Sequence, residues 1–225
     1  MSDFDDVRCL DAPLADKLEA YSARLVMANP TISSAYTNLV QKLMNAGAGG
    51  AARGVGDEMP SFALPDSTGS IRRLESFLET GPLVISFNRG HWCSYCRLEL
   101  LALNEIVSQI GELGASLVSI MPETATLTRQ LRERFSLGFP ILTDIDNGFA
   151  LRSNLMVALG PAVADLLRKS GNDLARFQGN DAWFVPIPAT YVVGRNGIIA
   201  AAFVNPDFRR RMSPQAILKA LETQA

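Results

Sequence analysis

Cys93 and Cys96, separated by Ser94 and Tyr95, form the one local concentration of reactive side chains in this 225-residue sequence. The two-residue spacer lets the second thiol reach the first, so the pair can cycle between dithiol and disulfide. Zinc is the competing chemistry, but a zinc site needs four ligands, and the sequence holds a single histidine, His91, and no second cysteine pair. A Cys–His hydrolase is disfavoured because its nucleophile and base usually come from distant segments. A structural cysteine pair is the third alternative, and redox chemistry without a metal or cofactor is favoured.

The segments around the cysteines favour a reactive thiol. A buried apolar run at 83–87 precedes them and an amphipathic helical pattern follows, which places both cysteines at a helix N-terminus. The unpaired N–H groups and the dipole at such an end stabilise a thiolate. Arg89 and Arg97 add positive potential, and Arg89 is a candidate to touch a thiolate or a substrate.

Four other side chains near the motif have expected roles. His91 is a candidate to hold a thiolate by its charge, with an exposed loop position as the alternative. Trp92 and Tyr95 are expected to wall the site, and Glu99 is a candidate buried proton acceptor for a resolving thiol. The third cysteine, Cys9, is expected to be unpaired near the N-terminus.

The elements that position this motif follow an α/β order. Four apolar runs are expected to be strands, at 83–87, 116–120, 190–193 and 198–204. Helical patterns are expected from the cysteines to about 110, at about 124–135 and at about 214–221. The first half is β-α-β-α, which predicts parallel strands with right-handed crossovers. Asn196-Gly197 is a hairpin signal, which predicts antiparallel strands in the second half. Together these halves predict a thioredoxin fold, with a central mixed sheet flanked by helices.

The sequence also predicts two parts outside the minimal fold. Helices at about 14–27 and 33–44, followed by the glycine-rich stretch 47–54, indicate an N-terminal helical extension over residues 1–52. Their apolar stripes are expected to pack on the main domain or on a second subunit. The main domain is expected to span 53–225, with an insertion of helices and a polar loop at about 147–183 that overhangs the cysteines.

The segment 56–221 resembles the peroxiredoxin-like branch of the thioredoxin superfamily, which includes alkyl hydroperoxide reductase and thiol-specific antioxidant proteins. Four stretches carry the resemblance, at 55–66, 87–96, 139–144 and 193–198. It implies a thiol-dependent oxidoreductase, an antioxidant peroxidase that reduces hydroperoxides through a Cys93–Cys96 cycle. The reductant would be thioredoxin-like or glutathione-type, and the protein would form a homodimer. The alternatives are a protein disulfide reductase without efficient peroxidase activity and a non-catalytic redox sensor.

Departures from the family pattern leave the attacking cysteine open. Aligned on Phe87, the family's threonine falls on Cys93, its peroxidatic cysteine on Cys96, and its peroxide-binding arginine on Pro188. The peroxiredoxin pattern therefore makes Cys96 the attacking residue, whereas the thioredoxin pattern makes it Cys93. Trp92 and Pro188 follow the thioredoxin pattern, in which a cis-proline faces the cysteines, so Cys93 is favoured and Pro188 is expected to be cis.

Bulk composition excludes some functions. The formal net charge is −2 and 48% of the residues are hydrophobic, so no global basic field attracts nucleic acid. The run Arg209-Arg210-Arg211 is expected to be a solvated turn. The sequence shows neither a signal-peptide pattern nor an apolar run long enough to cross a membrane, so a cytoplasmic location is expected.

Overall fold

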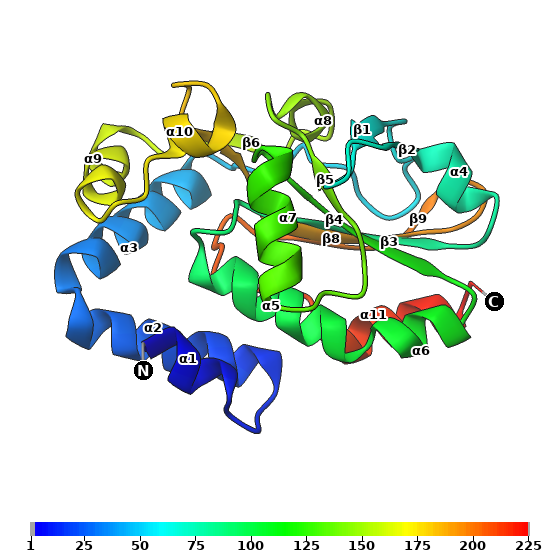
Figure 1. Ribbon diagram of the computed structural model, residues 1–225, viewed down its shortest axis with the longest axis horizontal. Coiled ribbons are helices and arrows are strands. Elements are labelled where there is room, and N and C mark those ends of the chain that lie inside the picture. Colours follow the sequence, from blue (N-terminus) through cyan, green and yellow to red (C-terminus); the bar gives the residue numbers. More distant parts are fainter. Residues whose placement is uncertain (1–2, 225) are drawn as a thin grey trace.

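A five-stranded mixed sheet forms the centre of the computed structural model, which describes residues 3–224 (Figure 1). The strand order is β5-β4-β3-β8-β9. The strands are β3 (Leu83–Phe87), β4 (Ser116–Met121), β5 (Ile141–Thr143), β8 (Ala189–Val193) and β9 (Ile199–Val204). β3, β4 and β5 run parallel, whereas β8 is antiparallel to both β3 and β9. This topology confirms the predicted thioredoxin fold.

The remaining elements surround this sheet (Figure 1). The longer helices are α2 (Leu14–Ala28), α3 (Pro30–Asn45), α5 (Ser94–Glu105), α7 (Ala125–Arg134), α9 (Pro161–Lys169) and α11 (Pro214–Glu222). The short helices are α1 (Asp3–Arg8), α4 (Leu74–Leu78), α6 (Val107–Glu112), α8 (Gly148–Arg152) and α10 (Leu174–Gln178). Two antiparallel pairs complete the chain: β1 (Ala63–Pro65) with β2 (Ile71–Arg73), and β6 (Met156–Ala158) with β7 (Phe184–Pro186).

The side chains of β3 alternate between the two faces of the sheet, and each face carries its own part of the core. Leu83, Ile85 and Phe87 point to one face, where they pack against residues of β1, α4 and α8. Val84 points to the other face, where α5, α6, α7 and α11 lie. Because both faces are covered, all five residues of β3 are buried, as the uninterrupted apolar run predicted.

The helix that begins at the cysteines is divided, whereas a single helix was expected. α5 ends at Glu105, and α6 starts at Val107. Ile106 between them has φ −109° and ψ 3°, and its N–H bonds to the Leu103 carbonyl, three residues back. The side chain of Ile106 is buried, so tertiary packing fixes this break in an otherwise continuous apolar stripe.

The N-terminal helices pack on the main body of the same chain. α2 contacts α5, and α3 contacts α9, so apolar residues of both helices enter a cluster that also holds Cys93 and Cys96. α3 starts at Pro30, three residues earlier than expected, because Asn29 caps it: Asn29 Oδ1 accepts a bond of 3.0 Å from Ile32 N.

The segment before β8 differs from its prediction in two respects. Besides helices it contains the β6–β7 pair, which the sequence analysis missed because each strand has only three residues. The expected cis bond before Pro188 is wrong, since residues 3–224 contain no cis peptide bond. Ile187 N donates to the Leu155 carbonyl at 2.7 Å and the chain passes extended from β7 into β8. No tight turn of the kind that favours a cis-proline forms there.

Candidate active site

The two cysteines lie where β3 gives way to α5. Cys93 is the residue that precedes the first turn of α5, and Cys96 lies within that turn. Both are free thiols, and both are buried, with 2% and 0% of their surface exposed. Their side chains hydrogen-bond to each other, and Arg89 N donates to Cys96 Sγ at 3.4 Å. Cys9, by contrast, is free and exposed.

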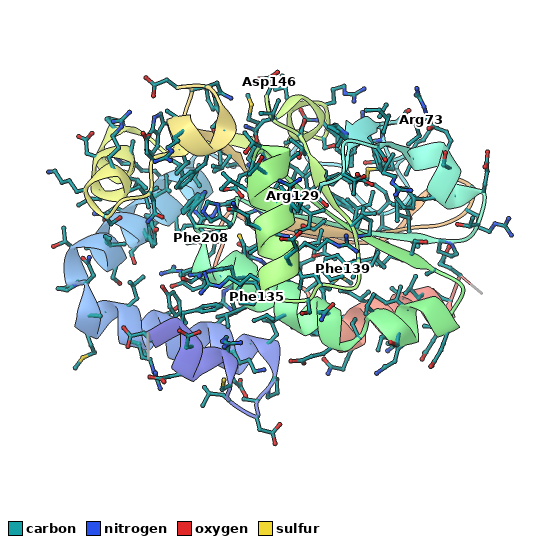
Figure 2. The ribbon with its side chains drawn as sticks, viewed as in Figure 1. Arg73, Arg129, Phe135, Phe139, Asp146 and Phe208 are labelled. Atoms are coloured by element: carbon teal, nitrogen blue, oxygen red, sulfur yellow. The ribbon has the colours of Figure 1, made fainter. Side chains whose placement is uncertain are left out.

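Arg89 supplies a buried positive charge directly at Cys93. Its Nη2 donates to Cys93 Sγ at 3.1 Å, and only 2% of the residue is exposed. The guanidinium carbon lies 3.6 Å from the Phe208 ring centre and 5.1 Å from that of Trp92, and Phe208 lies between the N-terminal helices and α7 in Figure 2. These aromatic faces hold a weakly hydrated cation away from water. Within residues 3–224 no carboxylate forms an ion pair with Arg89, which leaves the sulfur as its nearest counter-charge.

The surroundings of the two thiols shift their pKa values in opposite directions. Burial alone raises the pKa of Cys93, but the hydrogen bond from Cys96 and the charges of Arg89 and Arg211 outweigh it and lower that pKa well below its usual value. Burial raises the pKa of Cys96, and its hydrogen bond and proximity to the Cys93 thiolate raise it further. These opposite shifts favour a thiolate at Cys93 and a protonated thiol at Cys96.

Arg211 contacts Cys96, although the basic run 209–211 was expected to be a solvated turn. Its side chain is 1% exposed, its Nε donates to Glu99 Oε2 at 2.6 Å, and its Nη2 donates to Cys96 Sγ at 3.5 Å. It also donates to the Phe208 carbonyl. Thr190 Oγ1 donates to the other Glu99 oxygen at 3.2 Å. The sequence feature that could have revealed the contact between Arg211 and the site is Glu99, because a buried carboxylate within the apolar stripe of a helix requires a cation.

A pocket of about 340 Å³ opens in front of Cys93. The predicted residues Arg89, His91, Trp92 and Tyr95 all line it together with Cys93. Its remaining walls come from α2, α3, the start of α5 and the end of α9, through Tyr21, Leu25, Ile32, Tyr36, Ser94, Arg97, Leu167, Ser170 and Asn172. The N-terminal helices therefore form part of the site, which their remote position in the sequence did not indicate.

Tyr95 joins α2 to the cysteine motif, and Pro188 lies outside the pocket. The Tyr95 hydroxyl is 3.0 Å from Ser22 Oγ of α2, and its ring packs edge-on against Tyr21 at 5.1 Å. Pro188 is buried beside a separate small cavity that Arg89 and Phe208 also line. Pro188 is not among the residues that line the pocket in front of Cys93.

The sequence matches the AhpC/TSA family over residues 55–202. The chain belongs to the AhpC/TSA family. The match contains the cysteine motif, Arg89 and Glu99, whereas α2, α3 and Arg211 lie outside it. Within residues 3–224 of this AhpC/TSA protein, no helix is long and apolar enough to span a membrane, and no group of three or more potential ligands is placed to hold a metal ion.

Known proteins similar to this AhpC/TSA chain fall into two groups. It is 30% identical over 89 residues to a Mycobacterium tuberculosis protein provisionally named peroxiredoxin MT1643. The aligned segment covers 40% of this chain and 58% of the Mycobacterium protein. It is 30% identical over 91 residues to the thiol-disulfide oxidoreductase ResA of Geobacillus kaustophilus, covering 40% of this chain and 51% of ResA. The chain thus spans little more than half the length of these relatives.

The fold of the AhpC/TSA chain is similar to that of solved peroxiredoxin structures. The structure of peroxidoxin BcpB from Mycobacterium tuberculosis superposes with a TM-score of 0.60 at 20% identity, over 76% of this chain and 98% of that one. The reduced 2-Cys peroxiredoxin of Plasmodium vivax superposes with a TM-score of 0.58 at 16% identity, over 76% and 81%.

The buried Arg211–Glu99 ion pair next to Cys96 is expected to affect the stability of the folded protein. We expect Arg211→Met to lower the free energy of unfolding by about 3–5 kcal/mol, because it leaves Glu99 buried without a counter-ion. Adding Glu99→Gln should recover much of that loss, since a neutral amide needs no cation. Urea unfolding of both single variants and the double variant measures the coupling. Simple additivity of the two single effects would contradict a direct ion pair.

Proposed function

We propose that this AhpC/TSA protein is a thiol peroxidase in which Cys93 attacks the hydroperoxide and Cys96 resolves the product. One observation carries the proposal: Arg89 Nη2 donates to Cys93 Sγ at 3.1 Å inside an aromatic enclosure, and the neighbouring Cys96 is a second free thiol. A thiolate is the nucleophile in this chemistry, and a thiol within hydrogen-bond distance is the partner that a disulfide requires.

The proposed cycle has three steps. The Cys93 thiolate takes the terminal oxygen of a hydroperoxide, so the S–O bond forms, the O–O bond breaks, and the leaving oxygen gains one proton to become an alcohol or water. Cys93 is thereby oxidised by two electrons to a sulfenic acid. The Cys96 thiol then displaces water from it and closes the Cys93–Cys96 disulfide. An external dithiol returns the two electrons by exchange.

The geometry favours a small oxidant over a protein disulfide. Only 2% of Cys93 is exposed, and it faces a pocket walled by α2 and α3. A hydroperoxide fits a pocket of about 340 Å³, whereas a protein disulfide must bring its own backbone to the sulfur. The likeness to ResA supports the second candidate function, a thiol-disulfide reductase, and that activity would require these helices to move.

The proposed partners follow from the chemistry. A thioredoxin-like or glutathione-type donor would regenerate the dithiol, and the cytoplasm, which keeps such donors reduced, is the proposed location. A homodimer is proposed from the family resemblance alone, because much of the apolar surface of α2 and α3 packs within this chain.

Stopped-flow tryptophan fluorescence tests the proposal. The reduced protein is mixed with hydrogen peroxide, an alkyl hydroperoxide and a small disulfide, and Trp92 beside Cys93 reports oxidation. Trp183 is the only other tryptophan, so Trp183→Phe confines the signal to Trp92. Fast oxidation by a hydroperoxide is expected. Slow reaction with hydroperoxides and fast exchange with the disulfide would move the assignment to the reductase, and inert thiols would overturn both.

A further inference from the structure

His91 and Glu123 form a hydrogen-bonded pair at the edge of the pocket. His91 Nδ1 lies 2.7 Å from Glu123 Oε1, and His91 N donates to Glu123 Oε2 at 2.8 Å. The imidazole packs edge-on against Phe177 with ring centres 4.7 Å apart. Two contacts thus fix the ring, one to Glu123 and one to Phe177 of α10, and the backbone bond to Glu123 fixes the residue that carries it. The side chain of His91 keeps 30% of its surface exposed, on a residue that lines the pocket with Cys93.

Glu123 has His91 as its ion-pair partner within the described residues. It lies two residues beyond β4, its side chain is 0% exposed, and no lysine or arginine within residues 3–224 forms an ion pair with it. Gly90, with φ +135°, makes the approach possible, because a Cβ there would lie 2.5 Å from Glu123 Oε1. The contact with Glu123 occupies Nδ1, which leaves Nε2 as the ring nitrogen that Glu123 does not contact.

Resting on the peroxidase function proposed above, we propose that His91, positioned by Glu123, is the general acid that protonates the leaving oxygen of the hydroperoxide. The Cys93 thiolate supplies two electrons to the terminal oxygen and the O–O bond breaks. The imidazolium transfers its Nε2 proton to the departing oxygen. The products are a sulfenic acid that keeps the hydroperoxide's own hydrogen, an alcohol or water, and a neutral imidazole that regains its proton from solvent.

The other polar groups of the pocket are unsuited to this transfer. Arg89 can donate hydrogen bonds, and its Nε has no partner within the described chain, but a guanidinium does not give up its proton. Burial raises the pKa of Tyr21 and of Tyr36, so these phenols are weak proton donors at neutral pH. The charged and titratable groups that face the pocket are Arg89, His91, Cys93 and Arg97 around the motif, Tyr21 from α2, Tyr36 from α3 and Tyr95 from α5. From α9 and the chain after it, only the uncharged Leu167, Ser170 and Asn172 face it.

The test compares leaving groups that need a proton with one that does not. His91→Gln in the full chain is expected to slow the reaction with tert-butyl hydroperoxide about 10²-fold or more, the usual size of general-acid catalysis. Its reaction with peracetic acid, which expels a stable carboxylate, should stay within about twofold. Alkylation of Cys93 by iodoacetamide involves no leaving oxygen and should be equally unaffected. Glu123→Gln should show the same pattern, and Glu112→Gln, which removes an exposed carboxylate of α6, is the matched control.

The outcomes separate this proposal from the proposed function. If both variants match the wild type with tert-butyl hydroperoxide, or lose the same factor with all three reagents, His91 is not the acid although the protein is a peroxidase. If the wild type itself fails to react with any hydroperoxide, the proposed function falls and this assignment falls with it.

Discussion

Cys93→Ser is expected to lower the rate of hydroperoxide reduction by at least about 10³-fold, because it removes the nucleophile and leaves a hydroxyl that does not ionise near neutral pH. Cys96→Ser is expected to behave differently. Its Cys93 thiolate keeps Arg89, so one fast oxidation per molecule should remain while turnover with a reductant stops. The measurements are the stopped-flow burst and steady-state peroxide consumption.

Both variants should be made in a Cys9→Ser background, because the exposed Cys9 is able to form mixed disulfides that obscure the stoichiometry. Trapping with a sulfenic-acid reagent should label Cys93 in the Cys96→Ser variant. The reverse pattern, with the burst retained in Cys93→Ser and lost in Cys96→Ser, would make Cys96 the attacking residue. It would mean that the alignment with peroxiredoxins, and not the geometry around Arg89, identifies the nucleophile.

Arg89→Met is the second change with a large expected effect. A hydrogen bond to a charged group contributes about 1.5–3 kcal/mol, so its loss should raise the pKa of Cys93 by about one to two units. The rate of thiol alkylation should then fall about 10–100-fold at pH values below the pKa of the wild-type thiol. The pH profile of iodoacetamide alkylation in the Cys9→Ser, Cys96→Ser background measures both quantities. An unchanged profile would show that the thiolate does not depend on this guanidinium.

The same substitution changes how stability depends on pH. The pKa of Cys93 is lower in the folded than in the unfolded protein, so its thiolate stabilises the folded state at pH values above the unfolded pKa of about 8.5. That stabilisation is lost as the pH falls through the lower, folded pKa. We expect the melting temperature of the reduced wild type to rise with pH across this window and that of Arg89→Met to rise less.

Local patterns in the sequence were sufficient for the motif and for four strands of the central sheet, whereas β5 was not among the expected strands. The apolar run of β3 and the turn at Asn196-Gly197 depend on neighbours in the chain, so strand type and hairpin direction follow from a few residues. Arg211 could not be found in this way, because it lies 115 residues from the cysteine that it contacts and its neighbours Arg209 and Arg210 retain solvent contact. The α2–α3 wall of the pocket and the trans geometry before Pro188 likewise depend on long-range packing.

The absence of a carboxylate partner for Arg89 within the described chain also affects the redox equilibrium of the cysteines. A guanidinium that stabilises the Cys93 thiolate stabilises the dithiol state, and closing the disulfide removes that negative charge while the arginine stays buried. Lowering the pKa of one thiol therefore shifts the reduction potential to a less negative value, by about 30 mV for each 1.4 kcal/mol. In the proposed cycle, the buried cation that favours the attack on an oxidant would thus also make the resulting disulfide easier to reduce, so one residue would promote both halves of the cycle.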